Sequence, residues 1–509
     1  MIHWNGRAVL VIGLGASGLS MARHLAAAGA RVRVADTRAQ PPCEDALRAS
    51  LPAVECVRGP LCPGLFEGID CIAVSPGVAV LGPLVDPCVA DAIKAGAPVV
   101  GDIELFAQAL AAERSATGYA PKVLAITGTN GKTTVTALTA HLARRAGRHA
   151  VVAGNLGPPA LDAWAAARAA SRLPEVWVLE LSSFQLETTM TLAPDAATVL
   201  NVTEDHLDRH GSIAAYARLK ERIFAGGGVQ VLNRDDARVA AMLRPFKSRN
   251  RRDVPPVVYT FGTGEPCTAT DFGLIRESRP GGLAWLAQGP LGPHGPQGSE
   301  GQAQRLMPQD ALRIRGTHNA MNALAAIALN RALGIPLAPM LAALRDYPGE
   351  AHRAQPVAEV AGVRYIDDSK GTNVGATLAA LTGLGAELAG DRKLVLIAGG
   401  DGKGQDFTPM AAVVGAHCRA VMLIGRDARV LRDALQGAGV AMLDCSTLEL
   451  AVREAARCAQ PGDAVLLSPA CASLDMFQSY VQRADAFVSA VRELGRVEAA
   501  VEHPGAANA

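Results

Sequence analysis

A glycine-rich turn followed by a lysine and two threonines occupies residues 128–134, with the sequence GTNGKTT. Glycines allow backbone N–H groups to close around an anion, and the N-terminus of a following helix adds positive potential. In such a loop Lys132 reaches the β- and γ-phosphates of a nucleotide, and the hydroxyl of Thr133 binds Mg²⁺. Gly128 and Gly131 stand two residues closer together than in the usual G-x-x-x-x-G-K-[ST] loop, so the segment is a shortened form of it. We therefore predict that the protein uses ATP; the alternative is a glycine turn that binds nothing.

A second glycine turn lies near the N-terminus, where Gly13, Gly15 and Gly18 follow an aliphatic run and Asp36 closes the next run. This is the fingerprint of a dinucleotide-binding turn, and by itself it favours a nicotinamide-dependent dehydrogenase. The same turn suits any nucleotide diphosphate at a helix N-terminus. Because an ATP loop follows, we expect the diphosphate of a nucleotide-linked substrate here, with the Ser-Pro-Gly turn at 75–77 as a second source of N–H donors.

Polar residues follow two further aliphatic runs. Glu180 stands near the end of one run and is followed by two serines, and Asn201 begins the segment NVTEDH that ends at His206. In parallel sheets the active groups sit at the carboxyl ends of strands. A hard oxygen ligand and a histidine at neighbouring strand ends would complete Mg²⁺ coordination beside Thr133. The alternative for residues 203–206 is a capping segment with an ordinary surface histidine.

The residues described above must be positioned by strands and helices. Short aliphatic runs alternate with alanine-rich helical patterns along most of the chain. This alternation is typical of parallel sheets covered by helices. At 509 residues the chain is too long for one core. We predict an α/β protein of three domains: a Rossmann-like domain at 1–118, a central P-loop ATPase-like parallel-sheet domain at 119–350 and a C-terminal Rossmann-like domain at 351–509. The expected strands cover residues 9–12, 32–35, 71–74, 123–126, 176–181, 196–201, 393–399, 420–425 and 463–468.

The composition changes between about 277 and 309, where Gly, Pro, Gln and Ser dominate. The stretch GPLGPHGPQGS at 289–299 is the clearest example. Such segments bury too little apolar surface to fold by themselves. We expect a mobile surface insertion without a core of its own, and we assign it no function.

The overall charge and the cysteines argue against a nucleic-acid-binding protein, a membrane protein and a secreted protein. With 49 Lys and Arg against 48 Asp and Glu, the net charge of +1 gives no global field for DNA, RNA or an anionic membrane. Ten cysteines without a C-x-x-C pair fit reduced thiols in a cytosolic protein. The apolar N-terminal run leads directly into the glycine turn, so it is not a signal peptide, and no stretch suits a spanning helix of roughly 20 residues. We expect a soluble cytoplasmic protein.

Seven segments in a fixed order resemble one known family. They are GTNGKTT, LELSSFQLE (179–187), NVTEDHLDRH (201–210), THNAMNALAA (317–326), DDSKGTN (367–373), GGDGKG (399–404) and SPACASLDMF (468–477). Together they resemble the Mur ligase family over almost the whole chain, except the 277–309 segment and the C-terminal tail. The first domain and DDSKGTN are most similar to those members that join D-glutamate to UDP-N-acetylmuramoyl-L-alanine.

The resemblance implies an ATP-dependent amide-bond ligase that forms an acyl phosphate during peptidoglycan precursor synthesis, acting as a monomer. It also implies that the third domain closes over the second, since the ATP contacts come from both. A folylpolyglutamate synthetase and another Mur ligase remain alternatives within the ligases. The Asp-Asn-Pro-Arg segment typical of the meso-diaminopimelate enzyme is absent from the sequence. From another class, a dehydrogenase or an ATP-binding regulatory module would bind nucleotide without D-glutamate-dependent ADP formation.

The resemblance also assigns residues to the three substrates. The UDP-muropeptide would be held by Gly15, Ala16, Ser17, Asp36, Thr37, Arg38, Ser75, Pro76, Gly77, Asn155 and Ser182. ATP would be held by Gly128, Thr129, Asn130, Gly131, Lys132, Thr133, Thr134, Asn319, Asn322, Arg353 and Asp368. D-glutamate would be held by Lys370, Thr372, Lys403, Ser473, Leu474 and Tyr480, because carboxylates need cations and backbone donors.

By the same resemblance Lys132, His206 and Lys220 would be the catalytic residues. Two Mg²⁺ ions are expected, held by Thr133, Glu180, His206 and a carbamylated Lys220. The alternative for Lys220 is an exposed helical lysine, the usual state of that residue type. Tyr480 departs from the family, which often has phenylalanine there, and its hydroxyl would add one hydrogen bond.

Overall fold

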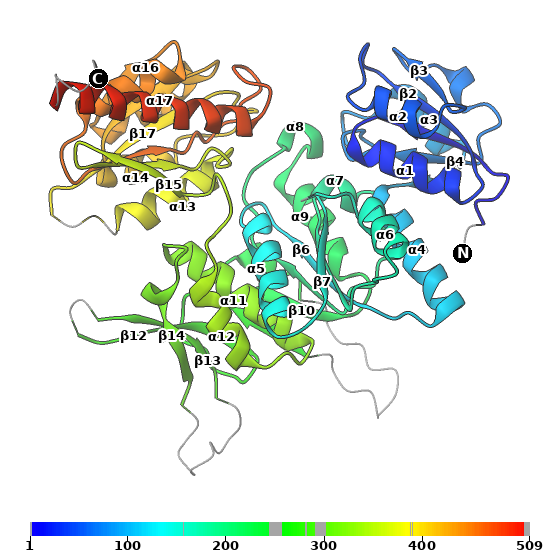
Figure 1. The fold of residues 1–509 in the computed structure, drawn as a ribbon, viewed down its shortest axis with the longest axis horizontal. Helices are drawn as coiled ribbons and strands as arrows, with labels where there is room; N and C mark the ends of the chain where they lie inside the picture. Colours follow the sequence, from blue (N-terminus) through cyan, green and yellow to red (C-terminus); the bar gives the residue numbers. More distant parts are fainter. Residues whose placement is uncertain are drawn as a thin grey trace, which may run out of the picture. The chain divides into compact units, whose positions relative to one another are not determined.

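The computed structural model describes residues 3–155, 157–243, 257–279, 282–290, 302–386, 388 and 390–502, which form three sheets with helices between the strands (Figure 1). The chain divides into two compact units. The first comprises Met1–Val202, Asp208–Ala311 and Met321–Asp346, and the second comprises Thr203–Leu207, Leu312–Ala320 and Tyr347–Ala509. Two of the sheets lie in the first unit and the third lies in the second. The predicted α/β class with three sheets is confirmed.

The first sheet consists of β1 (Ala8–Ile12), β2 (Arg31–Asp36), β3 (Glu55–Arg58), β4 (Cys71–Val74) and β5 (Val99–Val100). They run parallel in the order β3-β2-β1-β4-β5. Its helices are α1 (Ala16–Ala27), α2 (Glu44–Ser50), α3 (Pro87–Lys94) and α4 (Asp102–Thr117). Val9, Leu10 and Ile72 are fully buried, as expected where helices cover both faces of a parallel sheet. The strand order reverses between β1 and β4, and ligands of open parallel sheets bind at such a point, outside the carboxyl ends of the strands.

The second sheet has nine strands: β6 (Lys122–Thr127), β7 (Ala150–Gly154), β8 (Val176–Glu180), β9 (Ala196–Val199), β10 (Val229–Asn233), β11 (Val258–Phe261), β12 (Asp271–Arg276), β13 (Ala284–Gln288) and β14 (Gln304–Pro308). Their order is β14-β13-β12-β11-β10-β9-β6-β8-β7. The neighbours from β7 to β12 are parallel, and β13 is antiparallel to both β12 and β14. The helices are α5 (Lys132–Arg145), α6 (Ala160–Ala169), α7 (Ser183–Leu186), α8 (Leu207–His210), α9 (Ile213–Glu221), α10 (Ala237–Ala240), α11 (Thr317–Ala332) and α12 (Leu337–Asp346).

The expectation of a coreless insertion at 277–309 is wrong for its described residues. Strands β13 and β14 pair with each other and extend the second sheet. Leu286 and Ala287 are fully buried and Met307 is 1% exposed. The composition misled because the glycines and prolines of the connecting segments outnumber the few apolar residues of these strands. Residues 280–281 and 291–301 lie outside the described part of the chain.

The third sheet lies in the second unit and has the order β15-β16-β20-β17-β18-β19. Its strands are β15 (Gln355–Val360), β16 (Val363–Asp367), β17 (Leu394–Gly399), β18 (Cys418–Ile424), β19 (Ala441–Asp444) and β20 (Ala464–Leu467), and only the β15–β16 pair is antiparallel among these described strands. The helices are α13 (Val374–Gly385), α14 (Met410–His417), α15 (Ala428–Leu435), α16 (Leu448–Cys458) and α17 (Tyr480–Glu502). None of the helices described in either unit is long and apolar enough to cross a membrane.

The burial of β13 predicts that this hairpin contributes to the stability of the first unit. Leu286→Ala should lower the free energy of unfolding by about 2–5 kcal/mol, because it leaves a cavity under a fully buried side chain. Leu283→Ala is the matched control, since Leu283 is 36% exposed. Thermal unfolding of both variants measures the difference. Equal melting temperatures for the two variants would show that the hairpin adds nothing to the core.

Candidate active site

The turn between β6 and α5 is a loop that only glycine can form at two positions. Gly128 and Gly131 have φ values of +154° and +82°, a region that residues with a side chain rarely adopt. A Cβ on Gly128 would lie 2.9 Å from Cβ of Leu200, and one on Gly131 would lie 2.7 Å from Oδ1 of Asn322. The predicted strand, turn and helix are therefore all present, and the backbone of the turn packs closely against Leu200 and Asn322.

Asn201 fixes the shape of this loop from the end of β9. Its backbone oxygen accepts from the N–H of Thr129 at 2.9 Å, and its Oδ1 accepts from the N–H of Asn130 at 2.8 Å. Its Nδ2 donates to the carbonyl of Asn130 at 3.1 Å. The sequence placed Asn201 at a strand end near the phosphate loop, and the structure shows that its side chain binds the loop backbone.

Two lysines converge on the same carbonyl oxygen of the loop. Nζ of Lys132 donates to the carbonyls of Gly128 and Thr129 at 2.9 and 2.8 Å. Nζ of Lys220 donates to the Gly128 carbonyl at 2.8 Å and lies 4.4 Å from the ring centroid of Tyr216. Lys220 is 1% exposed, so the alternative of an exposed helical lysine is wrong. Like charges this close favour the binding of an anion beside them.

Glu180, the last residue of β8, has a carboxylate oxygen suited to a cation. The residue is 2% exposed. Its Oε1 accepts from Nδ2 of Asn155 at 2.7 Å, whereas its buried Oε2 has no hydrogen-bond partner among the described residues. Such an atom is costly to leave unpaired. Carboxylate oxygen is a preferred ligand of Mg²⁺, so the residue fits the predicted metal site.

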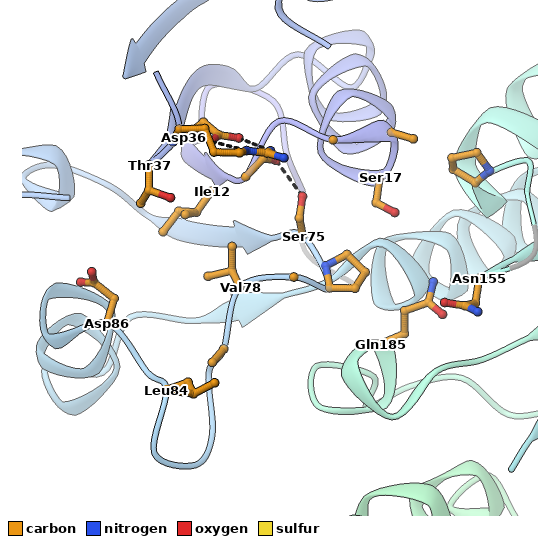
Figure 2. A pocket seen from close by; sticks show the side chains of 18 of the residues that line it. Ile12, Ser17, Asp36, Thr37, Ser75, Val78, Leu84, Asp86, Asn155 and Gln185 are labelled. Carbon is orange, nitrogen blue, oxygen red and sulfur yellow. Dashed lines mark hydrogen bonds and ion pairs between the residues drawn. The ribbon is translucent and has the colours of Figure 1, made fainter. Parts of the chain in front are cut away.

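A pocket of about 620 Å³ opens at the carboxyl ends of β1, β2 and β4, where the strand order reverses. It brings together every residue predicted for the UDP-muropeptide except Ser182. Figure 2 shows Leu84 and Asp86 toward one end of the pocket and Asn155 and Gln185 toward the other. The lining also includes Gly13 of the predicted glycine turn. The other lining residues were not predicted as site residues, and they are Ile12, Leu61, Val78, Ala79, Leu84, Asp86, Gly154, Gly157, Pro159 and Gln185.

Ser182 acts beside the pocket rather than in its lining. Its Oγ accepts from the N–H of Gln185, and the side chain of Gln185 accepts from the N–H of Ser182, which is a capping box for α7. The segment SSFQ carries a weak sequence signal for this cap. Nε2 of Gln185 also donates to Oδ2 of the buried Asp102 at 2.9 Å. Ser182 therefore positions Gln185, which lines the pocket.

Asp36 is held ionised at the edge of the pocket. It is 2% exposed, and its carboxylate accepts from the N–H of Leu14 at 2.6 Å and from Nε of Arg38 at 2.8 Å. Burial alone would raise the pKa of Asp36, but the hydrogen bonds from Arg38 and Leu14 outweigh it and lower the pKa to about 2. The hydrogen bond from Leu14 thus joins the glycine turn directly to the residue that closes β2.

In the second unit, Arg483 joins two of the segments predicted to hold D-glutamate. Its Nε donates to Oγ of Ser369 at 3.0 Å, its Nη2 to the carbonyl of Ser369 at 2.8 Å and its Nη1 to the carbonyl of Cys471 at 3.2 Å. Burial lowers the pKa of Arg483 to about 10, which leaves it charged at neutral pH. Nζ of Lys370 lies 5.4 Å from the ring centroid of Tyr480, so this ring contributes a face to a cation, while a hydrogen bond from its hydroxyl stays a prediction.

Residues Thr203–Leu207 belong to the second unit and include Asp205, which the sequence did not single out. Nζ of Lys403 donates to Oδ1 of Asp205 at 3.4 Å, and Nδ2 of Asn373 donates to its Oδ2 at 3.3 Å. His206 itself has a φ of +54° and places Nε2 3.7 Å from Oδ2 of Asp205. Lys403 and His206, two predicted site residues, therefore meet at one buried carboxylate.

Asp368 and Arg353, both predicted for ATP, lie close to each other in the second unit. Oδ2 of Asp368 accepts from Oγ of Ser468 at 2.7 Å, and its Oδ1 accepts from the N–H of Ala354 at 3.2 Å. Burial raises the pKa of Asp368 to about 6, and the charge of Arg353 opposes the shift. Nε of Arg353 is buried and has no hydrogen-bond partner among the described residues.

The chain matches three protein-family domains: the MurD-like N-terminal domain of Mur ligases at residues 7–101, the Mur ligase middle domain at 126–330 and the Mur ligase glutamate ligase domain at 352–471. It is 55% identical over 501 residues to a Burkholderia mallei protein named UDP-N-acetylmuramoylalanine--D-glutamate ligase, covering 96% of this chain and 97% of that protein. The chain belongs to the Mur ligase family. As a Mur ligase it is an ATP-dependent enzyme that forms amide bonds.

Solved Mur ligase structures share the architecture. UDP-N-acetylmuramate-alanine ligase MurC from Thermotoga maritima matches with a TM-score of 0.57 and 19% identity, covering 96% of this chain and 99% of that one. MurF from the same organism, in complex with ADP, matches with a TM-score of 0.54 and 16% identity, covering 84% of this chain and 95% of that one. At these identities the likeness concerns the fold.

The raised pKa of Asp368 predicts a pH-dependent contribution to stability. The pKa of Asp368 in the folded protein is about 6, above the ordinary value of 3.8, so between pH 3.8 and pH 6 the folded protein holds a proton that the unfolded chain releases. The stability that this proton contributes is fully present below the unfolded pKa. It is lost as the pH rises through the folded pKa. Asp368→Asn removes it, so the melting temperature of the variant relative to the wild type should rise by a few degrees between about pH 4.5 and pH 7.

Thermal unfolding without nucleotide measures that difference. Asp433→Asn, which changes an exposed carboxylate in the same unit, is the control and should show no such trend. A difference between Asp368→Asn and the wild type that does not change with pH would contradict the raised pKa.

Proposed function

We propose that this Mur ligase joins D-glutamate to the L-alanine carboxyl group of UDP-N-acetylmuramoyl-L-alanine, with ATP as the energy source, in peptidoglycan precursor synthesis. The observation that carries the proposal is the 55% identity, over 96% of the chain, to a ligase named for that reaction. The pocket at the switch point of the first sheet supports it, because its glycine turn suits a nucleotide diphosphate.

The reaction must activate a carboxylate, which is a poor acyl donor. The substrate carboxylate attacks the γ-phosphorus of ATP and gives an acyl phosphate and ADP. The amine of D-glutamate then attacks the activated carbonyl, and phosphate leaves from the tetrahedral intermediate. The chain contributes positioning and charge neutralisation, with Lys132 and the N–H groups of the loop at 128–131 against the phosphates.

Magnesium is part of the proposal. When bound, Mg²⁺ neutralises phosphate charge and orients the phosphate oxygens. Thr133, Glu180 and His206 are the residues that would hold two ions, together with Lys220 as a carbamate. The unpartnered Oε2 of Glu180 supports this assignment. A carbamate on Lys220 would keep one N–H for the Gly128 carbonyl, to which the amine donates at 2.8 Å.

The other predicted site residues are assigned to the three substrates. The lining residues predicted above hold the UDP-muropeptide, with Ser182 acting through Gln185. Asn319, Asn322, Arg353 and Asp368 hold ATP, and the unpartnered Nε of Arg353 supports its role. D-glutamate is placed by Lys370, Thr372, Lys403, Ser473, Leu474 and Tyr480. Catalysis is assigned to Lys132, His206 and Lys220.

The proposal includes the organisation and setting of the enzyme. We divide the chain into domains at 1–118, 119–350 and 351–509, each containing one sheet. We place the reaction in the cytoplasm, where ATP and nucleotide-linked precursors are available, and all ten cysteines are free thiols. We expect a monomer that binds no nucleic acid and does not insert into a membrane.

One assay tests the proposal. Phosphate release is measured with ATP, Mg²⁺, UDP-N-acetylmuramoyl-L-alanine and each candidate amino acid in turn. Release should require D-glutamate, and L-glutamate, L-alanine or meso-diaminopimelate should not replace it. Lys132→Ala is the control for the site and should lower the rate by at least about a hundredfold, because it removes a charge from the phosphates. Equal release with another amino acid, or full activity of Lys132→Ala, would refute the assignment.

A further inference from the structure

A buried ion pair in the first unit, between Arg209 and Glu187, has no role in the assignments above. The two residues are 5% and 4% exposed. Nε and Nη2 of Arg209 donate to Oε1 and Oε2 of Glu187 at 3.1 and 2.8 Å. This is the two-pronged geometry that arginine forms and lysine does not. Burying an ion pair rarely adds stability, since both charges lose their water, so its presence calls for another explanation.

The other hydrogen bonds of Arg209 go to a wall of the muropeptide pocket. Nη1 donates to the carbonyl of Gly77 and Nη2 to the carbonyl of Val78, both at 3.1 Å. Gly77 and Val78 line the pocket. The N–H of Val80 lies 3.5 Å from Oε2 of Glu187. Residues 77–80 follow β4 of the first sheet, whereas Arg209 and Glu187 follow β9 and β8 of the second. The pair therefore ties one wall of the pocket to the other sheet.

The opposite wall comes from the second sheet. Asn155 and Gln185 line the pocket there, and Figure 2 shows both on the side away from Asp86. Gln185 precedes Glu187 by two residues, and Asn155 donates to Glu180 at 2.7 Å. The distance between the two walls consequently depends on how the turn at 75–78 is held against the segment around Glu187. Because a misplacement of about 1 Å can lower a rate a hundredfold, this register matters for the reaction.

We propose that Arg209 and Glu187 are positioning residues that hold the nucleotide-binding turn at 75–78 in register with Asn155 and the ATP loop. Neither residue touches a substrate in this account. The inference rests on the proposed function, because that function supplies the occupant of the pocket. It predicts that breaking the pair weakens the use of the muropeptide selectively, while the ATP loop, which Asn201 holds independently, keeps its shape.

The test compares Arg209→Lys and Glu187→Gln with a matched control, Arg222→Lys. Nη1 and Nη2 of Arg222 likewise donate to backbone carbonyls, of Glu187 at 2.8 Å and Thr189 at 3.0 Å, and so serve the same segment without the pocket wall. The measurements are KM for the muropeptide, KM for ATP, kcat and the melting temperature, all on the full chain. Both test variants should raise KM for the muropeptide by about tenfold or more and leave KM for ATP within about twofold of the wild type, whereas Arg222→Lys should change neither.

Two results would overturn the inference: an unchanged KM for the muropeptide in the folded variants, or an equal rise in both KM values, which indicates a general structural defect. If Arg209→Lys does not fold, Glu187→Gln decides alone, because it keeps the size of the side chain and one acceptor oxygen. Wild-type protein without D-glutamate-dependent phosphate release would contradict the proposed function instead. The affinities of UDP for the wild type and the variants would then decide the role of the pair.

Discussion

Two lysine side chains meet at one backbone carbonyl, and the phosphate loop at 128–131 depends on this convergence for its arrangement. Lys132 and Lys220 both donate to the carbonyl of Gly128, at 2.9 and 2.8 Å. The whole chain carries a net charge of only +1, so the attraction for a triphosphate arises locally. Gly128 and Gly131 let the loop pack closely against Leu200 and Asn322, where a Cβ would clash, while Asn201 holds the loop backbone by hydrogen bonds. Charge and shape are thus supplied by different residues.

The other polar side chains of the two binding regions lie where they do because the carboxyl ends of parallel strands meet at one edge of a sheet. Asp36 closes β2, Ser75 follows β4 and Glu180 closes β8, so residues far apart in sequence reach the carboxyl ends of strands. Asn155 links the two binding regions, because it lines the muropeptide pocket and donates to Glu180 at 2.7 Å. Asn155 thereby joins the pocket to Glu180, the residue that we propose as a magnesium ligand.

The sequence predicted those features that carry a local signal. Strands β1, β2 and β4, the loop around Lys132 and the glycine turn at 13–18 carry aliphatic runs or glycines at fixed spacing, and the structure has them at those places. Strands β3 and β5 of the same sheet were not predicted. Residues that act through distant contacts were missed: Arg483 binds Ser369 across 114 positions, and Arg209 binds Gly77 across 132. The strands β13 and β14 were missed because pairing with neighbouring strands buries them, and the composition of their own segment gives no sign of this.

The fate of one oxygen atom tests the central claim most directly, namely that the carboxylate is activated by attack on the γ-phosphorus. UDP-N-acetylmuramoyl-L-alanine with heavy oxygen in its L-alanine carboxylate is converted by the wild-type enzyme with ATP and D-glutamate. Mass spectrometry of the released phosphate should find one labelled oxygen per molecule, because the acyl phosphate breaks at its carbonyl carbon. Amide product accompanied by unlabelled phosphate would contradict the account.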